Sequence, residues 1–333
     1  MDVYYKKNYG LLYEQIENGK CEIFVFQSSC GSVRHLFIKK EIPYLLNGIQ
    51  FYDIFSPYGY GGPLITSCKE GKRNVLAKEF EAAFSAYCKE QQIVCEFVRF
   101  HPLFSNALDF SACYELSFKS FTTGTALAPY TDPIQHEFSK STRKTIRKAL
   151  KAGVTYRITK KPESLAPFRT MYVETMKRIG ADDIYFFDDI YFSNCLAYFG
   201  DNIILVEAIY EEKTIGMELH FHYNKWIHTH LSATKEEFHH LSPVYIMTYA
   251  ITEWGKSNGA ELIHSGGGRT SEPDDNLYLF KKKFGQNTQF EYYTGSKIWN
   301  VEVYEQLCEK SGILMESDFF PAYRNPVETP SRV

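Results

Sequence analysis

The chain of 333 residues is long enough for two domains, and its hydrophobic content of 44% is ordinary for a globular protein. An aromatic content of 16% excludes extended disorder, and a formal net charge of -3 excludes a general affinity for nucleic acid. Any argument for a polyanionic partner must therefore come from a local cluster of charge.

Cysteine spacing and apolar segments indicate a cytoplasmic protein. None of the eight cysteines forms a C-x-x-C pair, and the first residues lack the apolar core of a secretory signal. No apolar run reaches the roughly 18 residues of a membrane span. We therefore expect reduced thiols, no membrane span, no metal and no tightly bound cofactor.

The first half of the chain begins with an alternating pattern that predicts strands. These strands are Cys21–Ser28, Val33–Lys39 and Ile49–Phe55. A turn-rich loop, S-P-Y-G-Y-G-G-P-L, follows from Ser56 to Leu64. An apolar stripe predicts a helix at Arg73–Glu90, and Ile93–Phe100 is predicted to be the next strand.

The second half repeats this order of elements. Its first three predicted strands are Ile203–Tyr210, Thr214–Tyr223 and Trp226–Ala233. A loop at Lys235–Pro243, a helix at Val244–Ser257 and a strand at Ala260–His264 come next, and the strand is followed by S-G-G-G. The repeated order predicts two α/β domains of similar build.

The segment between the two halves has two predicted parts. Turn formers at Thr122–Pro133 predict a linker. Two helices, Ser164–Ile179 and Asp188–Phe199, are then expected to complete the second domain.

Six cations without an intervening acid follow the predicted linker: Lys140, Arg143, Lys144, Arg147, Lys148 and Lys151. On a helix capped by Ser139 or Ser141 and closed by Gly153, all six fall within one arc. The opposite arc carries Ile146, Ala149 and Leu150. This face is either simply solvated, or it docks the phosphates of an RNA or of a nucleotide carrier.

The basic segment R-K-T-I-R-K-A-L-K-A-G-V resembles the segment that opens the second domain of FemABX-like proteins. These are tRNA-dependent aminoacyltransferases of peptidoglycan bridge synthesis, within the GNAT acyltransferase superfamily. Three other stretches are similar to family segments: the loop Ser56–Leu64, the stretch His264–Gly285 with its F-K-K-K-F element, and F-F-P-A-Y-R at Phe319–Arg324.

The resemblance implies an α/β (α+β) fold of two tandem GNAT-like domains, with mixed sheets flanked by helices. The first domain is expected at 1–137, with 301–333 returning to it, and the second at 138–300 with the donor site. The implied reaction transfers an acyl or aminoacyl group to an amine of a cell-envelope precursor. That precursor would be a peptidoglycan peptide or a nucleotide-linked amino sugar.

One loop departs from the acetyl-CoA type of the superfamily. The stretch K-E-E-F-H-H-L-S-P-V lacks the glycines of the pattern Q/R-x-x-G-x-G/A, although the N–H groups of Leu241 and Ser242 can still face an anion at a helix N-terminus. The donor is left open between aminoacyl-tRNA, acyl-CoA and an acyl carrier protein. One alternative is an acetyl-CoA-dependent N-acetyltransferase of surface polysaccharide synthesis. Another is a non-catalytic module that binds RNA or a carrier.

Acyl transfer to an amine requires a proton acceptor and a group that stabilises the oxyanion. The resemblance places Lys281 at the reacting centre. Acid–base candidates are Glu218, His230, Asp274 and Asp275. Candidates for the donor's phosphates are Arg143, Lys144, Arg147, Lys148 and Arg269, and candidates for the acceptor are Tyr58 and Tyr60.

Four histidines in H-F-H-Y-N-K-W-I-H-T-H raise the question of a metal site. A two-residue turn at Asn224-Lys225 would pair Tyr223 with Trp226. His220 and His222 then lie on one face of the hairpin, and His228 and His230 lie on the other. That register excludes a site made by all four histidines, whereas a longer loop would allow one.

Overall fold

The computed structural model describes residues 1–313, 317 and 319–325. Its contacts divide the chain into two compact units, Val3–Lys119 with Tyr292–Val333, and Ser120–Glu291. The division therefore falls earlier than the boundaries 137/138 and 300/301 expected from the sequence. It falls within β6 (Glu115–Ala126), whose second half pairs with β11 (Leu262–Gly266) in the second unit.

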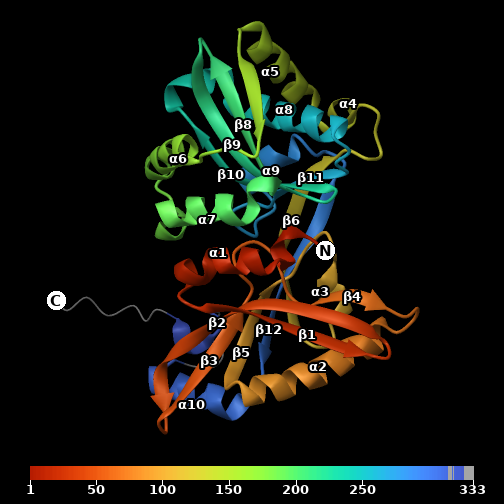
Figure 1. Ribbon diagram of the computed structural model, residues 1–333, viewed down its shortest axis with the longest axis vertical. Helices are drawn as coiled ribbons and strands as arrows, with labels where there is room; N and C mark the ends of the chain where they lie inside the picture. Colours follow the sequence, from red (N-terminus) through yellow and green to blue (C-terminus); the bar gives the residue numbers. More distant parts are fainter. Residues whose placement is uncertain (314–316, 318, 326–333) are drawn as a thin grey trace, which may run out of the picture. The chain divides into compact units, whose positions relative to one another are not determined.

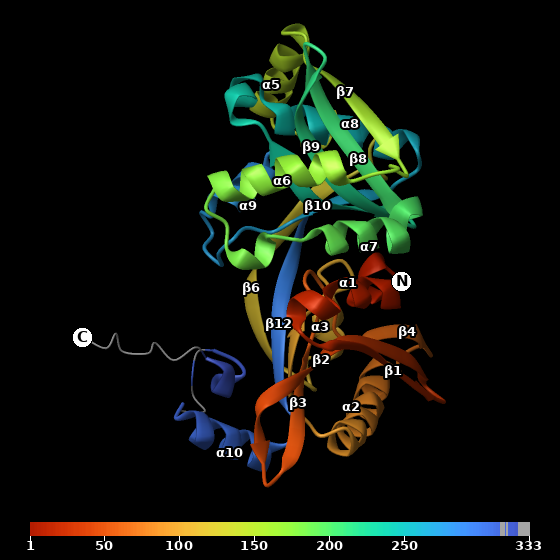
Figure 2. The same cartoon turned by 60° about the vertical axis from the view of Figure 1, so that its left-hand side comes forward.

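The first unit is a mixed sheet with helices on both faces. Its strands are β1 (Lys20–Ser28), β2 (Gly31–Leu46), β3 (Ile49–Phe55), β4 (Leu64–Cys68), β5 (Ile93–Arg99) and most of β12 (Gln289–Ile298). Its helices are η1 (Val3–Tyr5), α1 (Lys7–Glu17), α2 (Arg73–Glu90), α3 (Asn106–Asp109), α10 (Val301–Ser311) and η5 (Ala322–Arg324). The strand order is β1-β2-β3-β5-β12, with β4 paired to β2. Helix α2 covers one face, and α1 and α10 cover the other (Figure 2).

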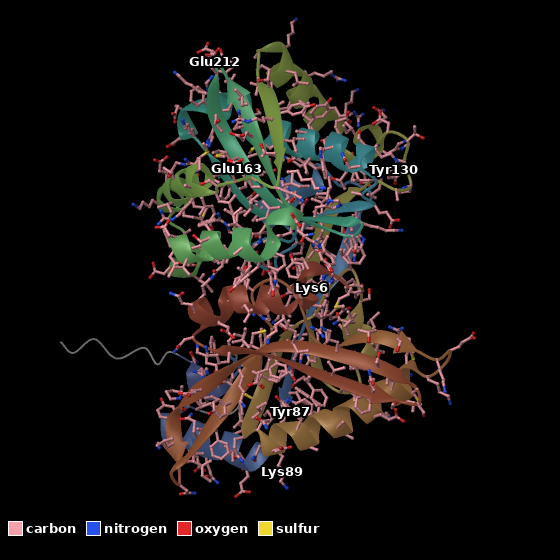
Figure 3. All side chains as sticks on the ribbon, in the orientation of Figure 1. Lys6, Tyr87, Lys89, Tyr130, Glu163 and Glu212 are labelled. Atoms are coloured by element: carbon pink, nitrogen blue, oxygen red, sulfur yellow. The ribbon has the colours of Figure 1, made fainter. Side chains whose placement is uncertain are left out.

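Aromatic residues on α2 form much of the core of the first unit. Phe80, Phe84 and Tyr87 are three or four positions apart, so they lie on one side of the helix. The rings of Phe80 and Phe84 stack with their centroids 5.4 Å apart, and those of Phe84 and Tyr87 stack at 5.7 Å. Tyr87 is labelled in Figure 3. The apolar stripe read from the sequence is therefore largely the buried face, although Val75 at its start is exposed.

The second unit has the same plan. Its strands are β6, β7 (Thr155–Lys160), β8 (Ile203–Tyr210), β9 (Lys213–Tyr223), β10 (Trp226–Thr234) and β11. Its α-helices are α4 (Pro133–Glu137), α5 (Lys140–Lys151), α6 (Ala166–Arg178), α7 (Asp189–Phe199), α8 (Pro243–Ser257) and α9 (Asn276–Lys282). Its 3-10 helices are η2 (Asp183–Tyr185), η3 (Gly200–Asn202) and η4 (Glu236–Leu241). The strand order is β6-β11-β10-β9-β8-β7, with α8 on one face and α6 on the other (Figure 1).

The predicted mixed α/β fold is confirmed, and so is the repeated order of elements. The predicted linker at Thr122–Pro133 is wrong in its first part, because Thr122–Ala126 belongs to β6. Thr123 and Thr125 are buried there, and the hydroxyl of Thr125 donates to the carbonyl of Phe284. Threonine is β-branched and suits a buried strand as well as a turn, which explains the error.

Within the part of the chain that the structure describes, no helix combines the length and the apolar character needed to cross a membrane.

Candidate active site

The second unit has an opening between two parallel strands. Strand β10 pairs with β11 only from Trp226↔Leu262 to His228↔His264. Beyond this point β10 continues to Thr234, while β11 turns at Gly266, whose φ is 75°, and enters the segment Gly267–Gly268. The two strands therefore separate in the middle of the sheet, where side chains from both can face a ligand.

Lys281 lies beside the end of β11. Its ammonium donates a hydrogen bond to the carbonyl of Gly267 at 2.7 Å. Burial lowers the pKa of Lys281 to about 8, while the carboxylates of Asp275 and Glu218 oppose that shift. Lys281 and Glu218, both predicted to be site residues, therefore interact electrostatically in the structure.

Glu218 approaches the opening from β9. The residue is 4% exposed, and its carboxylate accepts a hydrogen bond from the hydroxyl of Ser232 at 3.2 Å. Ser232 lies on β10 beyond the last pair with β11, so this contact is at the opening. The Nε2 atom of His220 lies 3.4 Å from the second carboxylate oxygen of Glu218. A buried carboxylate with an imidazole neighbour can accept a proton and pass it on.

His230 occupies a β-bulge. The register of β10 and β9 shifts between Thr229 and Leu231, which leaves His230 as the extra residue. The hydroxyl of Tyr191 lies 2.6 Å from Nε2 of His230. Burial lowers the pKa of His230 to about 3, with the neighbouring His228 and His220 adding to the effect. His230 is therefore neutral at physiological pH, and Tyr191 is a neighbour that the sequence did not reveal.

The predicted turn at Asn224-Lys225 is confirmed by the pairing of Tyr223 with Trp226. His222 pairs with Ile227 and His228 with Phe221, so His222 and His228 lie on opposite faces of the hairpin. Within the described ranges, no three His, Cys, Asp or Glu side chains are grouped so that they could hold a metal ion.

Asp275 holds the glycine turn in place. Its carboxylate accepts hydrogen bonds from the N–H groups of Tyr278 (2.8 Å), Arg269 (3.0 Å) and Thr270 (3.0 Å), and one from the hydroxyl of Thr270. These bonds, that of Tyr278 first, lower the pKa of Asp275 to about 2. Such a carboxylate suits a structural role as the N-cap of α9 better than the proton transfer expected for it. Asp274 beside it is exposed.

A glycine is required at position 268 of this turn. A Cβ atom built on Gly268 would lie 2.3 Å from a carboxylate oxygen of Asp275. The glycine run therefore allows the chain to pass close to the carboxylate that organises it. Arg269, which follows, is exposed, and its backbone N–H is one of the donors to Asp275.

The loop before α8 presents fewer free N–H groups than expected. Ser242 has a φ of 57° and donates its N–H to the carbonyl of His239, so this donor is already engaged. Leu241 packs against the apolar core of the unit. The loop also carries two acids, Glu236 and Glu237, in the first turn of η4.

The cationic helix forms as the sequence predicts. Ser139 caps α5 by accepting the N–H of Thr142, and Gly153, with a φ of 95°, follows its end. Ile146 and Ala149 are buried, whereas Leu150 is 37% exposed and does not join the buried face. The structure leaves these cations exposed: Lys140, Lys144, Arg147, Lys148 and Lys151.

Arg143 differs from the other cations of α5. Its guanidinium donates to the carbonyl of Gln135, on α4, and to that of Phe138, which follows α4. It is therefore tied to the protein at the start of the helix, whereas Lys144, Arg147 and Lys148 remain available to a partner.

Tyr58 and Tyr60 lie in the first unit among other aromatic residues. The carbonyl of Tyr58 accepts a hydrogen bond from the hydroxyl of Tyr9, and its ring lies 5.9 Å from that of Tyr13. The ring of Tyr60 meets that of Tyr292 edge-on at 5.5 Å. Tyr60 is therefore part of a packed aromatic cluster, and burial raises its pKa well above the ordinary value.

Sequence reasoning missed a group of charged residues near this cluster: Glu17, Lys40 and Arg99. They come from three separate elements, and no motif connects them. The only available signal was the presence of charged residues in otherwise apolar strands, namely Lys40 after F-I-K and Arg99 within F-V-R-F.

The second unit matches a known family. Residues 136–275 match the model of the acetyltransferase (GNAT) domain. Among curated proteins, none matches this sequence.

Solved structures share the fold over most of the chain. The structure of FemX is similar with a TM-score of 0.66 and 14% identity, over 91% of this chain and 93% of that one. The C-terminal domain of a putative lysylphosphatidylglycerol synthetase from Agrobacterium fabrum gives a TM-score of 0.54 and 12% identity, over 89% and 87%. L-PGS from Bacillus licheniformis gives 0.50 and 15%, over 89% and 93%.

Proposed function

Because the chain is FemABX-like in fold and carries a GNAT acyltransferase domain in its second unit, we propose that it transfers an acyl or aminoacyl group to an amine. The observation that carries the proposal is the separation of β10 from β11, with Lys281 on one side of it and Glu218 on the other. A donor's reactive carbonyl placed there would have a cation and a carboxylate at hand.

In the proposed reaction, the amine nitrogen attacks the donor's carbonyl carbon and forms a tetrahedral oxyanion. The Lys281 ammonium stabilises that oxyanion. Glu218, beside His220, accepts the proton that the amine loses. When the intermediate collapses, the bond to the carrier's oxygen or sulfur breaks, and the leaving atom takes up a proton.

Two donors are each favoured by a specific observation. Aminoacyl-tRNA is favoured by the exposed cations of α5, and by a loop before α8 that has two acids and an engaged Ser242 N–H in place of glycines. Acyl-CoA is favoured by the description of the matching family as an acetyltransferase. We propose aminoacyl-tRNA as the first donor to test, with acyl-CoA and an acyl carrier protein as alternatives.

The proposed acceptor is an amine of a cell-envelope precursor, either a peptidoglycan peptide or a nucleotide-linked amino sugar. The support is the resemblance to FemABX-like proteins. All eight cysteines are free, which suits a reaction in the reducing cytoplasm where aminoacyl-tRNA and acyl-CoA are found.

Transfer is tested by incubating the purified protein with a cell-derived amine pool and either charged total tRNA or acetyl-CoA, with the products read by mass spectrometry. Lys281→Met should lower the rate by about 100-fold, the order of magnitude for loss of one oxyanion donor. Lys283→Met is the matched control, because Lys283 belongs to the same motif but is exposed. Equal rates in both variants would contradict the mechanism.

Donor choice is tested by binding. A ligand at about 100 times its dissociation constant adds about 2.7 kcal/mol to stability, so acetyl-CoA should raise the melting temperature by a few degrees only if it is bound. If tRNA docks on α5, replacing Lys144, Arg147 and Lys148 with alanine should weaken tRNA binding and flatten its salt dependence. If transfer is absent with every donor, and Lys281→Met leaves the biological role intact, the non-catalytic alternative is correct.

A further inference from the structure

One face of the sheet in the first unit carries charged and aromatic side chains in adjacent rows. Strand pairing matches Ile38 with Phe55, and Phe55 with Phe97. Alternate residues of a strand share a face, so Lys40 lies on the same face as Ile38, and Arg99 lies on the same face as Phe97. Lys40, Phe55, Phe97 and Arg99 therefore form a continuous surface on three neighbouring strands.

Each cation of this surface lies over an aromatic ring. The ammonium of Lys40 is 5.9 Å from the centroid of Phe55, and the guanidinium of Arg99 is 5.4 Å from that of Phe97. Arg99 also donates through Nη1 to the carbonyl of Ser56 at 2.9 Å. These contacts fix the direction of both cations without neutralising either charge.

Helix α1 contributes an acid to the same surface. Leu11 of α1 packs with Leu36 and Ile38, so the helix covers this face. Glu17, at its end, interacts electrostatically with both Arg99 and Lys40, and burial raises its pKa. Within the described residues, Glu17 forms no ion pair with Lys40 or Arg99 at 4.0 Å or less. Glu17 thus acts on both cations without forming an ion pair with either.

The far side of the surface is closed by the C-terminal segment. Asp53, two residues before Phe55 on β3, is bound by Arg324 and by the hydroxyl of Tyr323. Its charge is therefore already matched by Arg324, although Lys40 also acts on it. The surface between α1 and η5 keeps an excess of positive charge, with two cations against the one carboxylate of Glu17.

The surface continues into the tyrosine cluster of the first unit. Arg99 interacts electrostatically with Tyr292, and the ring of Tyr292 contacts Tyr60. Tyr60 is one of the two residues, with Tyr58, that the sequence suggested for acceptor binding. Tyr292 therefore lies between Arg99 on the charged surface and Tyr60 in the S-P-Y-G-Y-G-G loop, and it connects the two.

We propose that Glu17, Lys40, Phe55, Phe97 and Arg99 form the acceptor site, and that the acceptor carries an anionic group close to an ammonium group. Lys40 and Arg99 bind the anion, which is a carboxylate or a phosphate, and Glu17 binds the ammonium. Phe55 and Phe97 form an apolar floor beneath the ligand. Naming this ligand as the acceptor rests on the proposed function, whereas the binding site itself does not.

Binding is measured by titration calorimetry on the full chain, without donor. Two probes carry both charges, O-phosphoethanolamine and glycylglycine, and two matched probes lack the ammonium, ethyl phosphate and N-acetylglycine. We expect a zwitterionic probe to bind at least about tenfold more tightly than its matched partner. Preference for O-phosphoethanolamine identifies a phosphate acceptor, and preference for glycylglycine identifies a carboxylate acceptor.

Variants distinguish binding at this site from a nonspecific effect of surface charge. Lys40→Ala should weaken binding of the preferred probe by about tenfold or more, and Glu17→Gln should remove the preference for the ammonium. Lys78→Ala is the matched control, because Lys78 is an exposed lysine of the same unit, on α2. Melting temperatures of the variants report whether they remain folded.

The proposal is overturned if none of the four probes binds at millimolar concentration, or if Lys40→Ala binds as wild type does. Probe binding that depends on Lys40 would stand even if no transfer were detected. If transfer occurs and its rate is unchanged by Lys40→Ala and Glu17→Gln, the proposed function stands, but this site is not where the acceptor binds.

Discussion

At the scale of single residues, burial gives Lys281 its distinctive chemistry. A lysine on the surface has a pKa near 10.5, and burial beside the glycine turn lowers that of Lys281 to about 8. The ammonium form is therefore dominant at neutral pH but is lost within the accessible alkaline range. A cation that gives up its proton so readily can stabilise an oxyanion and also take part in proton transfer.

This pKa predicts the alkaline limb of the pH profile. Protonated Lys281 is present below about pH 8 and disappears above it, so kcat/KM should fall by about tenfold per pH unit above that value. The measurement is kcat/KM for transfer between pH 6 and 10. A profile that stays level to pH 10 would mean that the charge of Lys281 is not used.

Hydrogen bonds to Asp275 keep its carboxylate ionised and fix the start of α9. Asp275→Ala removes the cap of α9 and should lower the free energy of unfolding by about 1–2 kcal/mol. The folded-state pKa, about 2, lies below the ordinary 3.8, so this stabilisation is present above about pH 4 and is lost as the pH falls toward 2. Denaturant unfolding at pH 7 and pH 3 measures it.

Asp274→Ala is the control, because Asp274 is the exposed neighbour of Asp275. If both variants lose equal stability at pH 7, the network around Asp275 does not hold the turn.

At the scale of elements, close backbone contacts position α9 and Lys281. A Cβ atom on Gly285 would lie 1.9 Å from the carbonyl oxygen of Gly124 in β6. Glu137 of α4 accepts hydrogen bonds from Asn287 and Thr288, which follow Gly285. The end of the F-K-K-K-F-G element is thus fixed against β6 and α4.

Gly285→Ala should therefore lower the free energy of unfolding by about 1–3 kcal/mol, the usual range for overpacking. It should also reduce transfer, because α9 must shift to relieve the clash. Gly200→Ala is the control, since a Cβ atom there meets nothing within 4 Å. Urea unfolding of both variants makes the comparison. Equal unfolding midpoints would show that β6 accommodates the added methyl group without loss of stability.

At the scale of the whole molecule, the C-terminal segment belongs to the first unit. Arg324 bonds Asp53 through Nε and Nη2, and it also donates to the carbonyl of Glu41. The hydroxyl of Tyr323 contacts both Asp53 and the thiol of Cys95. The chain leaves the first unit through β6 and re-enters it through β12, and the contacts of Tyr323 and Arg324 hold the later segment there.

Arg324→Ala leaves the Asp53 carboxylate, whose side chain is 3% exposed, buried without its cation. Loss of one partner of a buried pair costs about 3–5 kcal/mol, so the melting temperature should drop by several degrees. The double variant Asp53→Asn/Arg324→Ala should recover part of that loss. If it melts lower than Arg324→Ala alone, the carboxylate is held by Tyr323 and not by Arg324.

Much of the fold could be predicted because periodicity is local. The strands of the two halves, the helix Arg73–Glu90 and the capped cationic helix depend on residues within one element. The linker at Thr122–Pro133 was mistaken because burial of Thr123 and Thr125 depends on β11, which lies more than 130 residues away.

The sequence by itself determined the α/β class, the repeated order of elements and the cationic face of α5, since each depends on residues that are near in the chain. A recognisable motif made Lys281 a candidate site residue. Only the tertiary structure decided that β10 and β11 separate beside Glu218, that Asp275 is an anchor, and that Glu17, Lys40 and Arg99 share one face. These are contacts between distant segments, and a pKa is set by such contacts and by burial, neither of which local sequence specifies.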